Sequence, residues 1–154
     1  MLLTPRDMAP VVRPVHVTLP SSFELLELVQ LLSDRLSALA GLDEDATHWV
    51  SVAVRESVIN AIKHGNHGDR SKHVTVGFSL EPPAQPTALV VEVVDEGQGF
   101  DPGAVESPLE PENVLKSSGR GIFFMRSFMD DVSIAPGADG RGTVVRMVKK
   151  LASS

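Results

Sequence analysis

The spacing of hydrophobic positions predicts two helices in the first third of the chain. Leucine and valine recur at helical spacing over residues 25–39. Ser21 and Glu24, three residues apart, form the pattern of a capping box at the start of this helix. Asp43 is placed to cap a second amphipathic helix that runs to about His64.

Strands are predicted where the hydrophobic pattern changes from helical spacing to alternation. The β-branched segment from Val11 to Leu19 indicates a first strand, and Pro14 favours an edge position because it lacks a backbone donor. Residues 74–80 alternate strictly, which is typical of a half-buried strand. The nearly continuous apolar run over residues 88–94 favours a central strand.

The stretch over residues 95–119 has no hydrophobic period and is rich in glycine and proline. Loops of this length inside a compact domain are usually lids or binding loops, so we expect a lid at about residues 102–118. A third helix from about 120 to 129 and a hairpin of residues 132–134 and 143–151 complete the predicted elements.

The order of these elements is β-α-α-β-β-lid-α-β-β. It favours an α+β fold, a two-layer α/β sandwich in which helices cover one face of a mixed, mainly antiparallel sheet. A length of 154 residues favours one domain. We expect residues 1–10, with their two prolines, to form a flexible arm and residues 11–151 to form the domain.

Composition excludes several classes of function. The chain has no cysteine, which excludes disulfide scaffolds, thiol catalysis and cysteine-ligated metals. A net charge of −6 leaves no electrostatic footprint for broad binding to nucleic acid or to acidic membranes. Neither a signal peptide nor an apolar run of the ~20 residues that a membrane helix needs is recognisable. We therefore expect a cytoplasmic protein.

A first candidate for chemistry lies on the second predicted helix. Glu56 and Asn60 are four residues apart and share one face of an otherwise apolar-patterned helix. A carboxylate suits proton acceptance, and an amide oxygen suits a hard cation such as Mg²⁺. A solvated helix face is an equal alternative for these two residues alone. For His64 a structural role at the helix end is favoured over metal ligation.

A second candidate follows the predicted central strand. The Asp95 carboxylate at a strand end can accept a hydrogen bond from an exocyclic amine, and Gly97 and Gly99 let a flat ring approach the backbone. A glycine-rich turn or a calcium loop is the alternative, although the spacing of an EF-hand is absent.

Two further glycine motifs are weak singly. Gly119-Arg120-Gly121 would open the third predicted helix, where amides and glycines can cradle an anion. Neither a Walker loop nor a dinucleotide fingerprint occurs in the chain. Gly142-Thr143 begins the last predicted strand and would mean nothing alone.

The order of these motifs resembles that of the Bergerat-type ATPases, which include gyrase, heat-shock chaperones, histidine kinases and mismatch-repair proteins. Three stretches, residues 55–64, residues 94–100, and residues 119–125 with 128–132, resemble most closely the anti-sigma factors that are serine/threonine protein kinases. The resemblance extends over roughly residues 11–150. By this resemblance, the fold is the Bergerat fold and the cofactors are ATP and Mg²⁺.

The resemblance also implies roles on the nucleobase side. Asp95 would accept from the adenine amino group, and Gly97 and Gly99 would form the wall beneath the ring. Thr143 would support the adenine side. The aspartate would thus be the residue on which nucleotide affinity depends.

On the phosphate side, the resemblance implies that Asn60 ligates Mg²⁺ and that Glu56 is the general base on the incoming hydroxyl. Gly119, Arg120 and Gly121 would bind the phosphates. These roles agree with the chemistry of phosphoryl transfer, which needs positioning and charge neutralisation more than covalent chemistry.

The family's substrate is an anti-anti-sigma protein, and its other partner is a sigma factor held by a homodimer. Direct contact with nucleic acid or a membrane is not expected. One alternative is a nucleotide-gated protein-binding module without phosphotransfer. A histidine-kinase-like catalytic domain is disfavoured because the roughly 40 residues before the second helix contain no dimerising helical hairpin with a phospho-acceptor.

Overall fold

The computed structural model describes residues 14–98, 123 and 125–152. The arm predicted at residues 1–10 and the lid predicted at residues 102–118 lie outside the described residues. None of the described helices has the length and apolarity that a bilayer crossing requires.

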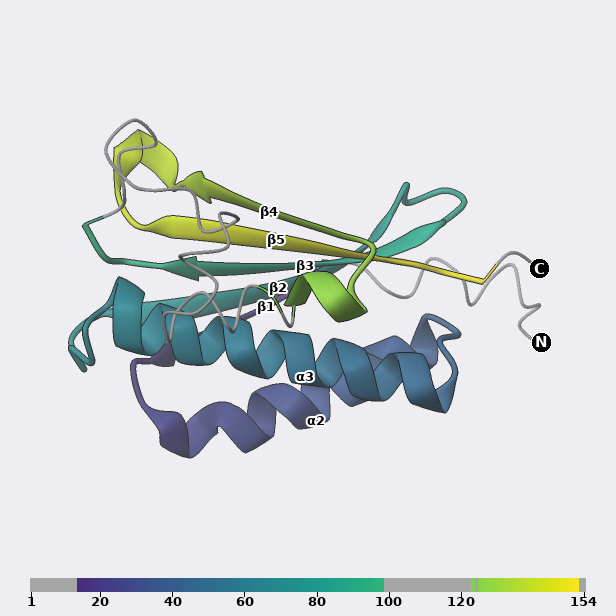
Figure 1. Cartoon of the computed structure of the whole chain (residues 1–154), viewed down its shortest axis with the longest axis horizontal. Coiled ribbons are helices and arrows are strands. Elements are labelled where there is room, and N and C mark those ends of the chain that lie inside the picture. Colours follow the sequence, from purple (N-terminus) through teal and green to yellow (C-terminus); the bar gives the residue numbers. More distant parts are fainter. Residues whose placement is uncertain (1–13, 99–122, 124, 153–154) are drawn as a thin grey trace, which may run out of the picture.

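The described strands form one five-stranded sheet in the order β1-β2-β3-β5-β4. Helices cover one of its faces, which confirms the predicted two-layer α+β fold (Figure 1). All four pairings between the described strands are antiparallel, so the sheet shows none of the parallel pairs expected of a mixed one. The strands are β1 Val15–Pro20, β2 His73–Glu81, β3 Ala88–Asp95, β4 Asp131–Pro136 and β5 Thr143–Lys150.

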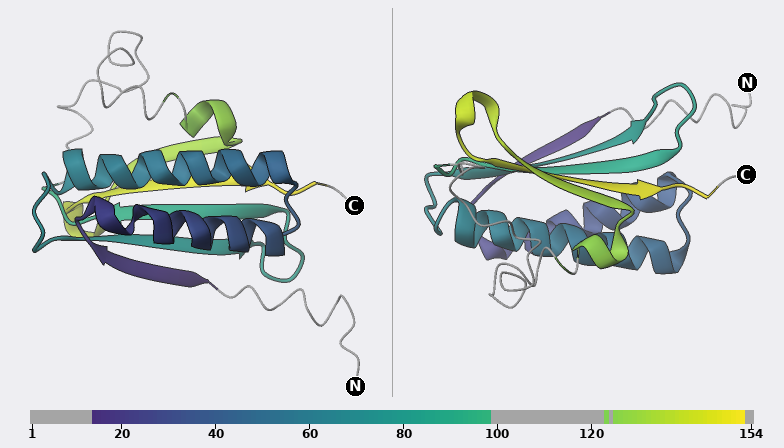
Figure 2. Two further views of the ribbon diagram at one scale, coloured as in Figure 1. Left: turned by 90° about the horizontal axis from the view of Figure 1, so that it is seen from below. Right: turned by 45° about the horizontal axis from the view of Figure 1, so that its top comes forward.

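Two long helices, α2 (Leu26–Leu39) and α3 (Glu44–Asn60), lie side by side against the sheet (Figure 2). Asp43 caps α3 as predicted, because its Oδ1 accepts from the Ala46 backbone N–H at 2.8 Å. After Asn60 the chain continues for one π-helical turn, η3 (Ala61–Gly65). The helical segment therefore ends close to His64, as the sequence predicts.

The capping box predicted at Ser21 is wrong by one residue. Ser22 is the N-cap, and it caps a 3₁₀ turn, η2 (Phe23–Leu25), that precedes α2. Ser21 is buried, and its hydroxyl donates to the backbone carbonyl of Lys72 at 2.9 Å. Because the Ser21 hydroxyl bonds to Lys72, it does not cap the helix as the sequence pattern predicted.

The core lies between the helices and the sheet. Buried α3 residues such as Val50, Val54 and Val58 follow the helical period, and β2 contributes alternate residues such as Val76 and Phe78. The central strand β3 buries Leu89, Val91 and Val93 in the core and Val90 on its other face, which explains most of its apolar run, while Glu92 is exposed.

A helical segment precedes β4 and packs on α3. Residues 125–128 are helical, and the Phe128 ring stacks on Trp49 of α3 with 3.9 Å between ring centroids and an interplanar angle of 5°. His48 meets the same indole edge-on at 4.8 Å. The start of α3 is thereby fixed to the segment that leads into β4.

The fold brings the ends of three secondary-structure elements together. The C-terminal end of α3, the end of β3 and the start of β5 meet at one end of the molecule, on the left in Figure 1. The register agrees, since Val94 pairs with Val144 and the next residues are Asp95 and Thr143. Residues that are far apart in sequence therefore share one site.

Candidate functional site

A cavity of about 280 Å³ opens where these three elements meet. Asn60 from the end of α3, Asp95 from the end of β3 and Thr143 from the start of β5 line it. Its volume is near the lower end of the roughly 300–1,000 Å³ of ligand pockets. Three of the site residues predicted from sequence are thus brought to one cavity.

The carboxylate of Asp95 is held in a fixed orientation. Only 7% of the residue is exposed, and its Oδ1 accepts from the backbone N–H groups of Gly97 at 3.0 Å and Thr143 at 3.1 Å. Its Oδ2 is directed toward Gly65, where a Cβ would collide with it. Because both amides use Oδ1, Oδ2 keeps its capacity to accept from a ligand.

Burial raises the pKa of Asp95 above the ordinary value of an aspartate. The amides of Gly97 and Thr143 act in the opposite direction, as do the charges of Lys72 and His67. Desolvation is the largest of these effects, so the ionised carboxylate lacks the solvation that it would have in water. A ligand that donates a hydrogen bond to it would restore part of that solvation.

Two glycines allow the backbone to close around this carboxylate. A Cβ at Gly97 would collide with the carbonyl of Gly65, and a Cβ at Gly142, whose φ is +69°, would collide with the carbonyl of Asp95. The Gly142 N–H donates to the Gly97 carbonyl at 2.9 Å and joins β3 to β5 at the site. Gly97 therefore lies next to the site. The close approach of Gly142 to Asp95 explains why a glycine precedes Thr143.

Sequence reasoning missed Asn66, which is completely buried. Its Nδ2 donates to Ser21 Oγ at 2.8 Å and to the His73 carbonyl at 3.0 Å, and its Oδ1 accepts from the Glu96 N–H at 2.8 Å. The side chain thus joins the turn after η3, the end of β1 and the residue next to Asp95. An asparagine between glycines is typical of an ordinary turn, so the sequence held no signal of this role.

Glu56 and Asn60 differ in their relation to the cavity. Both are half-buried on α3, one turn apart, but only Asn60 is among the lining residues. The exposed His64 also contributes to the lining. Among the described residues no group of three histidine, cysteine or acidic side chains is placed to hold a metal ion. The Asn60 amide oxygen suits Mg²⁺, which proteins bind through few side chains together with substrate phosphates.

Four predicted site residues lie outside the part of the chain that the structure describes. They are Gly99, Gly119, Arg120 and Gly121. Their contacts with a ring or with phosphates remain predictions.

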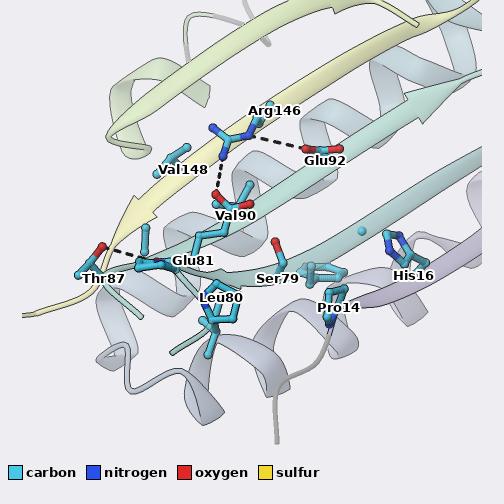
Figure 3. A pocket seen from close by; sticks show the side chains of 15 residues that line it. Pro14, His16, Ser79, Leu80, Glu81, Thr87, Val90, Glu92, Arg146 and Val148 are labelled. Carbon is cyan, nitrogen blue, oxygen red and sulfur yellow. Dashed lines mark hydrogen bonds and ion pairs between the residues drawn. The ribbon is translucent and has the colours of Figure 1, made fainter. Parts of the chain in front are cut away.

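A larger hollow, of about 920 Å³, lies on the face of the sheet opposite the helices (Figure 3). Its charged side chains are paired with each other: Arg146 reaches Glu81 at 2.7 Å and Glu92 at 3.7 Å. None of the predicted site residues lines it. The candidate site is therefore the smaller cavity beside Asp95.

Comparison with solved structures supports this fold. The chain superposes with a TM-score of 0.65 on the RsbU and RsbW domains of Rv1364c from Mycobacterium tuberculosis, at 20% identity over 92% of this chain and 33% of that one. It superposes with a TM-score of 0.52 on the mycobacterial sensor histidine kinase MprB, at 17% identity over 90% of this chain and 97% of that one. At these identities the likeness shows the fold alone.

Sequence relatives span nearly the same length. The chain is 28% identical over 142 residues to the serine-protein kinase RsbW of Staphylococcus epidermidis, covering 88% of this chain and 87% of that protein. It is 24% identical over 144 residues to the serine-protein kinase RsbW of Oceanobacillus iheyensis, covering 90% and 87%. A family model described as the histidine kinase-like ATPase domain matches residues 19–149. The chain therefore belongs to the histidine kinase-like ATPase domain family.

Proposed function

We propose that this protein is an ATP-dependent serine/threonine protein kinase that acts as an anti-sigma factor and phosphorylates an anti-anti-sigma protein. The observation that carries the proposal is the oriented carboxylate of Asp95, with one free oxygen at the cavity. The chain that contains Asp95 aligns over most of its length with relatives named serine-protein kinase.

Asp95 selects the base of the nucleotide in this proposal. Its Oδ2 accepts a hydrogen bond from the exocyclic amine of adenine, because an ionised carboxylate can only accept. A base with a carbonyl at the same position would face the carboxylate with a second acceptor. The close approach of the backbone at Gly97 and Gly142 keeps the carboxylate aligned.

Asn60 and Glu56 serve the transfer step. Asn60 supplies an amide oxygen to Mg²⁺, which neutralises phosphate charge when it is bound. Glu56 takes the proton of the serine or threonine hydroxyl while its oxygen bonds to the γ-phosphorus. The bond from that phosphorus to the bridging oxygen breaks, which leaves ADP and a phosphorylated side chain.

The partners in this proposal come from the resemblance to anti-sigma kinases. A homodimer of the chain would hold a sigma factor inactive, and phosphorylation of the anti-anti-sigma protein would prevent that protein from displacing it. The relatives' name supports the kinase part of this scheme.

A second candidate function is a nucleotide-gated binding module that holds a partner without phosphorylating it. One observation favours it: Glu56 does not line the described cavity, although Asn60, one turn later, does. The two functions differ only in whether Glu56 acts on a substrate.

The test uses the full chain with γ-labelled Mg-ATP and a panel of small anti-anti-sigma proteins. We expect Asn60→Ala to weaken Mg-ATP binding. Glu56→Gln keeps the size and polarity of the side chain, so we expect it to preserve binding while phosphotransfer falls by roughly 10²–10⁴-fold, the usual effect of losing a positioned base. The exposed Glu27→Gln variant on α2 is the matched control.

Each outcome decides between the candidates. Transfer that requires Glu56 supports the kinase. Transfer at the wild-type rate by Glu56→Gln removes Glu56 from the mechanism. Tight Mg-ATP binding without transfer to any protein of a panel that contains the true partner supports the binding module, and no ATP binding contradicts both.

A further inference from the structure

Ser57 is a buried serine whose hydroxyl is unpaired. Only 1% of the residue is exposed, and its Oγ has no hydrogen-bond partner among the described residues. Ser57 lines the cavity together with Asp95 and Thr143. It directly follows Glu56 on α3, and the proposed function gives it no role.

Unpaired buried hydroxyls also occur at Ser33 and Ser37 on α2. Those two serines do not line the cavity. Leaving a buried hydroxyl unpaired is unfavourable, because the group has lost its bonds to water and gained none in exchange. At Ser57, unlike at the other two, a ligand in the cavity can supply the missing partner.

We propose that Ser57 is a specificity-determining residue that donates a hydrogen bond to a ring nitrogen of the bound purine. This inference rests on the proposed function, because it concerns the same ATP site. Asp95 offers an acceptor and Ser57 adds a donor within one cavity.

This pair of groups matches one class of base. In a 6-aminopurine, the carbon that carries the amine is flanked by N1 on one side and, across the ring junction, by N7, and both nitrogens are acceptors. An amine that donates to Asp95 therefore has an acceptor beside it for the Ser57 hydroxyl. A 6-oxopurine instead places an acceptor against the carboxylate.

The test measures affinities for ATP, 1-deaza-ATP and 7-deaza-ATP by calorimetry on the wild type and on Ser57→Ala. Each analogue replaces one ring nitrogen by a C–H group. We expect the wild type to bind one analogue about three- to tenfold more weakly than ATP, the effect of one hydrogen bond. Ser57→Ala should bind ATP more weakly by a similar factor and bind ATP and that analogue alike.

Ser37→Ala is the matched control. It also removes a buried, unpaired hydroxyl, but one that does not line the cavity, so ATP affinity should stay at the wild-type value. Thermal unfolding without nucleotide should give both variants a Tm equal to or above that of the wild type. A loss of affinity in Ser57→Ala then comes from the lost donor and not from unfolding.

Two results would overturn the inference in distinguishable ways. If the wild type binds ATP and Ser57→Ala binds ATP and both analogues as the wild type does, Ser57 makes no bond to the base while the proposed function stands. If the wild type binds no ATP, the proposed function fails and the inference fails with it.

Discussion

At the scale of single residues, Asp95 combines burial with a free acceptor. Its Oδ1 satisfies two backbone amides, and its Oδ2 has no hydrogen-bond donor among the described residues. The carboxylate therefore holds the loop together in the absence of a ligand and keeps one oxygen for recognition.

Asp95→Asn should separate these two tasks. The asparagine Oδ1 can accept from Gly97 and Thr143 as before, while an NH₂ group replaces the free oxygen. We expect the free energy of unfolding without nucleotide to be unchanged or higher at neutral pH, and ATP affinity to fall about tenfold or more because two donors then face each other. Thermal unfolding and calorimetry measure the two effects. An undiminished affinity would mean that another group recognises adenine.

The raised pKa of Asp95 predicts how the stability of the nucleotide-free protein and its ATP affinity change with pH. The folded protein holds the proton of Asp95 up to a higher pH than the unfolded chain does, so the nucleotide-free protein loses stability as pH rises through the raised pKa. ATP affinity should increase over the same interval, because the carboxylate is then the acceptor. Denaturant titrations of wild type and Asp95→Asn over a pH series test this prediction. Parallel curves for the two proteins would contradict it.

Asn66 is predicted to stabilise the fold and to position the chain next to Asp95. Asn66→Ala removes partners from Ser21 and from the Glu96 N–H, and we expect the free energy of unfolding to fall by about 2–3 kcal/mol. The KM for ATP should also rise, because Glu96 adjoins Asp95. Urea unfolding and kinetics measure both quantities. A loss below about 0.5 kcal/mol, the range of ordinary surface substitutions, would show that the network is dispensable.

The residues of the site differ in how far sequence could predict them. Asn60 and Asp95 could be proposed because their chemistry and spacing are local to one helix or to one strand end, whereas Thr143 follows only from the family resemblance. Ser57 and Asn66 could not, because each is defined by what surrounds it in the fold. The partners of Asn66 include Ser21, 45 residues away, and Glu96, 30 residues away.

At the scale of elements, hydrophobic period predicted the helices and strands because burial sets that period. The edge position of β1 was predicted from Pro14, which lies just before the strand in the structure, and the central position of β3 from its apolar run. Ser21 and Ser22 fit the cap equally well by propensity. The contact of Ser21 with the Lys72 carbonyl decided between them, and such a contact leaves no trace in local sequence.

The stack of Trp49 on Phe128 should connect α3 energetically to the segment before β4. Because the rings are parallel at 3.9 Å, we expect a double-mutant cycle with Trp49→Ala and Phe128→Ala to give a coupling of about 1 kcal/mol. Urea unfolding of the four proteins measures it.

Trp49 and Phe23 form the control pair for this cycle, because Phe23 lies far from Trp49. Its ring lies 5.9 Å from the Lys63 ammonium, and Lys63 is about 20 Å along the helix from Trp49 at ~1.5 Å per residue. Trp49→Ala and Phe23→Ala should therefore be additive. Additivity in the Phe128 cycle as well would mean that the stack contributes no coupling.

At the scale of the whole molecule, one sheet separates two hollows. The candidate site lies at the end shared by α3, β3 and β5, while the larger hollow of Figure 3 lies on the face away from the helices. Val90, on β3, lines that second hollow and is nonetheless only 2% exposed. No described residue lines both hollows, so each can be altered by substitutions that leave the lining of the other unchanged.

Arg146→Ala tests this separation. The guanidinium and its partners Glu81 and Glu92 are all partly exposed to solvent, so its loss should change the free energy of unfolding by no more than about 1 kcal/mol. ATP affinity should be unaffected, since Arg146 does not line the candidate site. Calorimetry with ATP is the deciding measurement. A changed affinity would reveal that the sheet couples its two faces.

The Trp49–Phe128 stack also gives the protein an optical reporter of its own. The 154 residues contain one tryptophan and no tyrosine, so indole emission arises from a single position. That indole is 39% exposed, which leaves it sensitive to solvent, and its neighbour belongs to the segment leading into β4. Any change in the packing of that segment on α3 would alter the intrinsic fluorescence, and unlabelled protein in a stopped-flow cell is enough to follow it.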